Sequence, residues 1–226
     1  MFQSPPNANS ETVTCNFMTT TELMNKLKQL RKLDGKSLFK KDYFKVFGSD
    51  KHHYNLNPTL SEKEIKHFES TNSITLPDDY RNFLIHIENG GAGPAYGLFK
   101  LDDWKYELDI KDNSFLSTQF PYTDNWNMRY SGDTSNDDYY STPEFQDWEK
   151  EYFDNKHVTG TIRICHYGCA IYFLLVITGQ EKGSIWVDDR ANDMGLYPAI
   201  SKTTKQKMTF TEWYDEWLNE SINKLS

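Results

Sequence analysis

The longest unbroken apolar stretch in this 226-residue chain is the eight-residue run 170–177. A helix that crosses a bilayer needs about 20 apolar residues, so the chain is predicted to have no transmembrane helix. The run instead has the length of a strand that is buried on both faces. Alternating residues at 161–166 and a short apolar group at 184–187 flank it, and 178–183 reads as a polar turn. These three segments predict an antiparallel set of strands.

Apolar residues at helical spacing predict five helices around these strands. Capping boxes at Ser61 with Glu64 and at Thr209 with Glu212 mark two of the helix starts. We expect aromatic stripes in the last two helices to face the core. The order of elements predicts an α+β fold, in which helices pack on a mostly antiparallel sheet. The predicted helical segments are 22–33, 61–69, 77–87, 142–153 and 209–225.

Composition divides the chain into three parts. Residues 1–18 are polar and lack periodicity, so we expect a flexible N-terminus. Residues 19–57 are predicted to form a helical extension, with a second short element between Phe39 and Phe47. Residues 58–226 are predicted to form the main domain, interrupted by a long acidic insertion at about 102–155.

The cysteines and the first residues of the chain bear on its location. Cys15, Cys165 and Cys169 are too few, and odd in number, for a disulfide framework. The first residues lack a positively charged segment followed by an apolar stretch, which a secretory signal requires. We therefore expect a cytoplasmic protein with no membrane partner.

Negative charge is concentrated in the centre of the sequence. The formal net charge is −8, yet residues 102–154 alone hold fourteen acidic and four basic residues. Binding to phosphate needs clustered Lys and Arg, so nucleic acid is disfavoured as a direct partner. The segment favours a basic protein partner, although a merely solvated acidic surface would have the same composition.

Motifs for catalysis or cofactor binding are absent from the sequence. The glycine-rich run 90–94 ends a helix and is not followed by Lys-Ser or Lys-Thr, so it does not match a phosphate-binding loop. Cys165 and His166 would point to opposite faces of a strand, which disfavours a metal site. His52 and His53 lie in a polar stretch and are expected to be solvated. We predict no catalytic residue, no cofactor and no metal.

The polar run 188–195 is a more specific cluster. It lacks the alternating ligands and the distal Glu of a calcium loop. Two interpretations remain for it: a turn in which Arg190 pairs with Asp188 and Asp189, or a loop that contacts a partner. Acidic residues number 33 in all, so sequence spacing alone singles out no catalytic carboxylate pair.

An ordered set of short motifs resembles the SUKH superfamily. The set begins with a helix that contains Glu69 and ends with a helix that carries Phe210, Trp213 and Trp217. The resemblance covers roughly residues 58–225, apart from the extension before it and the acidic segment within it. The motifs between the two helices are 76–80, 83–84, 89–91, 160–164, Gly168, 174–176 and 183–186.

This resemblance implies a non-enzymatic binding fold. The superfamily includes a fungal cell-wall assembly regulator and many bacterial immunity proteins, which act in the cytoplasm and neutralise a cognate toxin that is often a nuclease. We therefore predict an immunity protein that binds a basic toxin domain. The alternatives are a regulatory scaffold that binds several partners weakly, and a hydrolase that uses carboxylates beside tryptophans.

The acidic, aromatic segment is the predicted contact surface, because Tyr and Trp dominate interface energetics and acids steer a basic partner. Alternatively, its aromatic residues pack the segment onto its own domain and its acids are simply solvated. The predicted partner-binding residues are Trp104, Tyr106, Asp109, Asp112, Trp126, Asp137, Asp138, Tyr139 and Tyr140, together with Asp188, Asp189 and Arg190 of the polar run.

Overall fold

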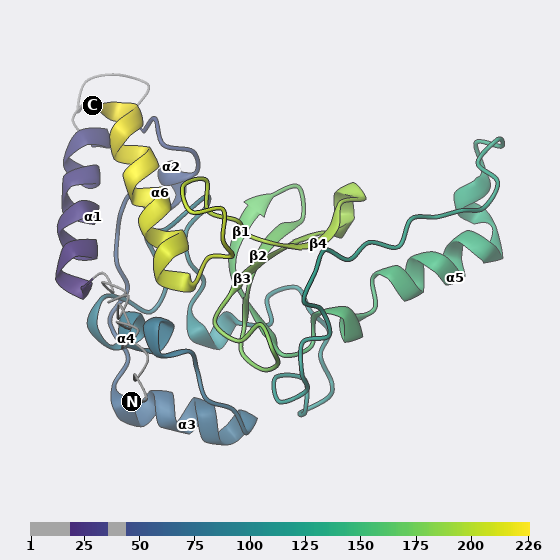
Figure 1. Ribbon diagram of the computed structural model, residues 1–226, viewed down its shortest axis with the longest axis horizontal. Coiled ribbons are helices and arrows are strands. Elements are labelled where there is room, and N and C mark those ends of the chain that lie inside the picture. The colour runs from purple at the N-terminus through teal and green to yellow at the C-terminus, as the bar shows by residue number, and fades with distance from the viewer. Residues whose placement is uncertain (1–18, 36–43) are drawn as a thin grey trace, which may run out of the picture.

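The computed structural model describes residues 19–35 and 44–226, arranged as helices and a sheet from which one arm projects (Figure 1). The predictions for residues 1–18, and for Phe39 and Tyr43, lie outside the described residues. The helices are α1 (Thr20–Asp34), α2 (Ser49–His52), α3 (Glu62–Asn72), α4 (Asp78–His86), α5 (Pro143–Tyr152) and α6 (Phe210–Leu225). Short 3₁₀ turns are η1 (Leu101–Asp103), η2 (Tyr139–Ser141), η3 (Asn155–Val158) and η4 (Arg190–Asn192).

The sheet is an antiparallel meander in the order β1-β2-β3-β4. Its first three strands are those predicted from the sequence. The fourth was not predicted, because it is short and contains both Gly195 and Pro198, residue types that are depleted in strands. The α+β prediction is confirmed. The strands are β1 (Thr161–Gly168), β2 (Ile171–Val176), β3 (Ile185–Asp189) and β4 (Gly195–Pro198).

Local signals fix the starts of two helices as predicted. The Ser61 hydroxyl accepts a hydrogen bond from the Glu64 amide at 3.3 Å, and the Thr209 hydroxyl accepts one from the Glu212 amide at 3.4 Å. Both are capping boxes, in which the glutamate also reaches back to the amide of the cap residue. Helix α4 ends at His86, before Gly90.

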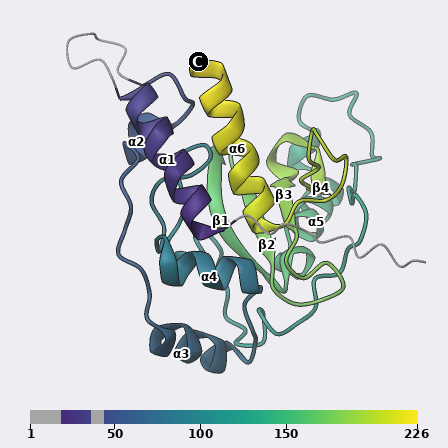
Figure 2. The same cartoon turned by 60° about the vertical axis from the view of Figure 1, so that its left-hand side comes forward.

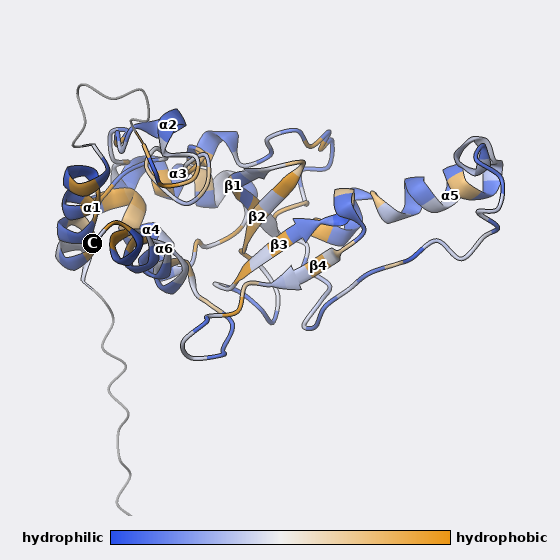
Figure 3. Cartoon of the chain, turned by 90° about the horizontal axis from the view of Figure 1, so that it is seen from above, coloured by the Kyte–Doolittle hydropathy of each residue, from blue (hydrophilic) through white to orange (hydrophobic). Residues whose placement is uncertain are grey.

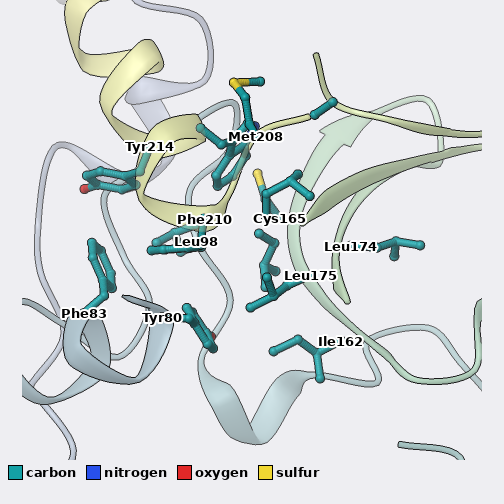
Figure 4. Packing of buried hydrophobic residues seen from close by; sticks show 14 of the residues in the cluster. Tyr80, Phe83, Leu98, Ile162, Cys165, Leu174, Leu175, Met208, Phe210 and Tyr214 are labelled. Carbon is teal, nitrogen blue, oxygen red and sulfur yellow. The ribbon is translucent and has the colours of Figure 1, made fainter. Parts of the chain in front are cut away.

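Helices α4 and α6 lie on one side of the sheet, and α1 packs against these two helices (Figures 1 and 2). Trp213 of α6 packs on Phe173 of β2, with ring centroids 5.0 Å apart, and Phe210 packs on Phe83 of α4 at 4.9 Å. Figure 4 shows the rings of Phe83, Phe210 and Tyr214 on the helix side of the core, with Leu175 and Ile162 of the strands on the other side. Helix α1 lies along α6, and their apolar faces turn inward (Figure 3). The first helix therefore shares the main core.

The acidic segment covers the opposite face of the sheet. Phe120 packs edge-on against Trp186 of β3 at 4.9 Å, and the Trp186 side chain is fully buried. Backbone bonds from Phe99 to Ile164 and between Trp126 and Leu196 occupy both outer edges of the sheet. No strand forms within residues 102–141, where the sequence left room for one or two.

The aromatic stripe of α5 does not face the main core, contrary to the prediction. Helix α5 points away from the sheet (Figures 1 and 3). Phe145 contacts Tyr130 and Tyr139, with ring centroids 5.1 and 5.3 Å apart. Amphipathic spacing shows that one face of a helix is covered, but it does not show what covers that face. Here the cover is the chain segment that leads into the helix.

Candidate functional site

The feature that stands apart from the rest of the fold is the projection formed by residues 126–152, which we call the arm. It leaves the sheet at Trp126, whose backbone exchanges two hydrogen bonds with Leu196 of β4 at 2.8 and 2.7 Å. The chain then runs outward to η2 and returns along α5 (Figure 1). The arm is therefore a long hairpin of loop and helix that starts at the edge of the sheet.

A row of aromatic rings holds the two sides of the arm together. The Trp126 ring stacks on Tyr152 at 5.6 Å, and Tyr152 stacks on Trp148 at 4.9 Å. The row continues through Phe145, 5.2 Å from Trp148, to Tyr139. None of residues 127–152 belongs to the main hydrophobic core. The arm thus has a small aromatic core of its own.

Polar contacts tie the base of the arm to the turn before β4. The Tyr152 hydroxyl donates to Asn127 Oδ1 at 2.8 Å, and Asn127 Nδ2 donates to the Asp193 carbonyl at 2.7 Å. Farther out, the Trp148 indole N–H donates to the Met128 carbonyl at 2.9 Å. These bonds fix α5 relative to both the outgoing chain and residues 192–194.

The surface of the arm is acidic. Residues 126–152 contain seven acidic and two basic residues. Asp137 and Asp138 are exposed near the far end, beside the exposed ring of Tyr140. A hydrogen bond from the Ser135 amide lowers the pKa of Asp133 below its ordinary value, so this carboxylate is charged at neutral pH. Exposed acids around aromatic rings are the combination expected of a surface that binds a basic protein.

A groove of about 480 Å³ lies between the arm and the turn before β4, and we call it the arm groove. Met194 stands on its rim with 59% of its surface exposed. Side chains of the aromatic row form much of its wall. Its lining residues are Asn127, Met128, Arg129, Tyr130, Thr134, Tyr139, Phe145, Trp148, Tyr152, Asn192, Asp193 and Met194.

A second groove, of about 430 Å³, lies beside α6 on the other side of the sheet, and we call it the α6 groove. Phe47, Tyr167 and Ile200 are its exposed apolar residues, and the Phe47 and Tyr167 rings lie 5.1 Å apart. Its charged residues are Lys202, Glu216, Glu220 and Lys224, two of each sign. The α6 groove is therefore apolar but carries no net charge.

The structure divides the predicted partner-binding residues among separate places. Trp104 and Asp112 line a hollow beside α3, far from the arm (Figure 1). Tyr106 stacks on Phe99 at 4.7 Å, and Asp109 is exposed in an ion pair with Lys111. Trp126 is half-buried at the base of the arm. Asp137, Asp138, Tyr139 and Tyr140 lie together near its far end.

Asp188, Asp189 and Arg190 are buried, with 4–7% of their surfaces exposed. Two bonds from Arg190 reach the Asp188 carboxylate, at 2.8 and 2.9 Å, and a third reaches the Tyr152 carbonyl at 3.0 Å. Arg163 adds a second cation 3.7 Å from Asp188. Arg190 therefore pairs internally with Asp188 but not with Asp189, whose carboxylate accepts bonds from Asn192 and Tyr197. The Arg190 contacts link the base of α5 to β3.

Several buried titratable groups were not predicted from the sequence, among them His52 and Glu88. His52 was expected in solvent but is buried in α2, where its Nδ1 accepts a bond from the Tyr54 amide, and burial lowers its pKa to about 4. Glu88 is fully buried beside Tyr214, and burial raises its pKa to about 9. Both lie inside the body of the fold and away from the arm. The adjacent Asn89-Gly90-Gly91 turn was the only signal near Glu88.

The described residues show no constellation for metal chemistry. Within 19–35 and 44–226, no group of three or more His, Cys, Asp or Glu side chains is placed to hold a metal ion. Cys165 is buried and Cys169 exposed, and both are free thiols. Across the same ranges, every helix is too short or too polar to cross a bilayer.

Comparison with known families gives a match. The sequence profile of the SMI1/KNR4 family (SUKH-1) matches residues 59–216, a range that includes the whole sheet and the arm. A search of curated proteins and a search of solved structures each found no match. The match spans more than half of the chain and confirms the resemblance predicted from its motifs.

Proposed function

The chain belongs to the SMI1/KNR4 family (SUKH-1), and from this premise we propose that it is an immunity protein that neutralises a toxin by binding it through the arm. The wider SUKH family includes both toxin immunity proteins and SMI1/KNR4 regulators. We propose that it acts in the cytoplasm, without catalysis. The toxin would be a protein with a basic surface, such as a nuclease.

The observation that carries this proposal is the arm itself. It projects from the sheet, has an aromatic core separate from the main one, and presents seven acidic residues against two basic ones. An enzyme that binds phosphate has Lys and Arg where its substrate lies. An acidic arm docked there would occupy the substrate path, and opposite charges would speed the encounter of the two proteins.

The test begins with a captured candidate toxin that is harmful when expressed alone and harmless when co-expressed with this chain. Its association rate with the chain is then measured at low and moderate salt. Replacing both Asp137 and Asp138 with Lys should slow association by about tenfold at low salt and flatten its salt dependence, because steering by exposed charges is screened by ions.

The matched control replaces Asp109 and Asp112 with Lys. This variant changes the net charge equally, but in the segment beside α3, away from the arm. Its effect should be clearly smaller. If both double variants slow association equally, only the net charge of the chain matters. If the Asp137→Lys, Asp138→Lys variant associates at the wild-type rate, the arm is not part of the interface.

The α6 groove favours a second candidate, a regulatory scaffold with more than one partner. It is apolar, lies away from the arm and carries exposed aromatic rings. A scaffold would bind several proteins weakly, whereas an immunity protein binds one tightly. Stoichiometry and dissociation constants of the captured partners separate these two functions.

A further inference from the structure

We propose that the arm groove receives an apolar side chain, such as Leu or Met, from a partner segment whose flanking residues are Lys or Arg. This inference rests on the proposed function, since it concerns the same arm. It adds the chemistry of the contact: a central apolar anchor within a basic segment, in place of charge attraction alone.

The walls of the arm groove have the composition of an anchor pocket. Trp148, Phe145 and Tyr130 contribute aromatic rings, and Met128 and Met194 contribute flexible thioether side chains. Buried anchors in aromatic pockets supply most of the binding energy of protein interfaces. Methionine adapts its shape to different apolar side chains, which suits a pocket for an aliphatic anchor.

The arm groove is formed before any partner arrives. The Trp148 indole is held by its bond to the Met128 carbonyl at 2.9 Å, so the two sides of the arm keep their spacing. The opposite wall is held by the bond from Asn127 to the Asp193 carbonyl at 2.7 Å. A pocket with fixed walls spares the partner the free energy of ordering it.

Charge selects the flanking residues of the partner. Among the lining residues, Asp193 and Arg129 balance one another. The arm around them has an excess of acids, with Asp133, Asp137 and Asp138 on the chain that leads to η2. A basic segment that places its apolar residue in the arm groove would carry its cations over this acidic surface.

The two grooves do not differ in the net charge of their lining. Lys202 and Lys224 offset Glu216 and Glu220 in the α6 groove, as Arg129 offsets Asp193 in the arm groove. The arm groove is distinguished by its place on the acidic arm, which holds seven acidic and two basic residues, so we assign the basic partner to it.

The experiment titrates the full-length chain with three short fluorescent peptides followed by anisotropy. The first is lysine-rich with a central Leu, the second has Ser in place of that Leu, and the third keeps the Leu but has Glu in place of every Lys. We expect the first peptide to bind at least about tenfold more tightly than the second, the ratio expected for burying one leucine. We expect no saturable binding of the third.

Matched variants locate the contact. Met194→Arg adds bulk and positive charge at the rim of the arm groove, and should weaken binding of the Leu peptide about tenfold. Ile200→Arg makes the same kind of change at an exposed apolar residue of the α6 groove and should have no effect, because 45% of Ile200 is exposed and its replacement leaves the core intact.

The outcomes separate this inference from the proposed function. The apolar anchor is overturned if the lysine-rich peptides bind equally with Leu or Ser and if Met194→Arg does not change their affinity. The acidic interface still stands in that case if the double variant Asp137→Lys, Asp138→Lys abolishes binding. If the lysine-rich and glutamate-rich peptides bind alike, the acidic interface fails as well. Weakening by Ile200→Arg alone would move the site to the α6 groove and overturn the inference.

Discussion

The hydroxyl of Tyr152, the last residue of α5, donates a hydrogen bond to Asn127 Oδ1 at 2.8 Å, and so joins the end of the arm to its beginning. Because Asn127 also donates to the Asp193 carbonyl at 2.7 Å, the arm is fastened to the turn before β4. The arm is thus held at its base by side chains as well as by its covalent connections.

The first prediction concerns this bond. Replacing Tyr152 with Phe removes one hydrogen bond, worth about 1 kcal/mol, and should raise amide hydrogen exchange in α5 about fivefold while the body is unaffected. Tyr139→Phe is the control, since the Tyr139 hydroxyl makes no hydrogen bond to the described residues. Equal exchange in the two variants would show that the bond does not fasten the arm.

The second prediction separates the arm from the body. Trp148→Ala should open the arm to limited proteolysis yet leave urea unfolding of the body nearly unchanged, because Trp148 lies outside the main core. Trp213→Ala should lower the free energy of unfolding by about 3–5 kcal/mol, because the buried Trp213 ring packs on β2. If Trp148→Ala lowered the free energy of unfolding as much as Trp213→Ala does, the arm and the body would unfold as one unit.

The third prediction concerns the buried ion cluster. Asp188→Asn removes the charge that balances Arg190 and Arg163, so it should lower the free energy of unfolding by about 3–5 kcal/mol. Asp109→Asn is the control, since its ion pair with Lys111 is exposed, and it should stay within about 0.5 kcal/mol of the wild type. Denaturant unfolding measures both, and a neutral Asp188→Asn would contradict the cluster's role.

The fourth prediction uses pH. Burial raises the pKa of Glu88 from an ordinary value of 4.5 to about 9, so the folded chain keeps a proton that the unfolded chain has lost. Its contribution to stability is complete below pH 4.5 and disappears as the pH rises to about 9. The free energy of unfolding of the wild type should therefore fall by about 1.4 kcal/mol per pH unit in this window, relative to Glu88→Gln.

His52 restricts where that slope is measured. Burial lowers its pKa from 6.5 to about 4, so its contribution grows as the pH rises between those values and opposes the effect of Glu88. Unfolding should therefore be compared from pH 6.5 upward. Glu149→Gln, on the exposed surface of α5, is the matched control and should show the wild-type slope. Parallel pH profiles for Glu88→Gln and the wild type would show that Glu88 is ionised in the fold.

Elements with signals inside their own sequence were predictable. The capping boxes at Ser61 and Thr209 begin α3 and α6, and the run 170–177 contains β2, because those structures depend on residues a few positions apart. Strand β4 depends on its neighbour β3 and on Trp126, so its short sequence gave little indication of it. The burial of His52 likewise comes from contacts with distant residues such as Trp217.

The candidate site was only partly predictable for the same reason. Composition pointed to an acidic, aromatic segment, and the arm lies within it. Sequence proximity did not show that Trp104 and Tyr106 lie beside β1, where Arg163 bonds both of their carbonyls, whereas Asp137 and Tyr140 lie near the far end of the arm. Nor did it show that Asp188 and Arg190 would be buried as a pair, or that Met194 would face α5 across a groove.

The separate aromatic core of the arm bears on how such a chain can diversify. Since residues 127–152 contribute nothing to the main core, substitutions on the outer surface of the arm leave the packing that stabilises the body untouched. The outer surface of the arm can therefore vary in sequence while the body of the fold stays constant. Among homologues, we expect the exposed residues of the arm to vary in sequence more than Trp126 and Tyr152, which hold the arm at its base.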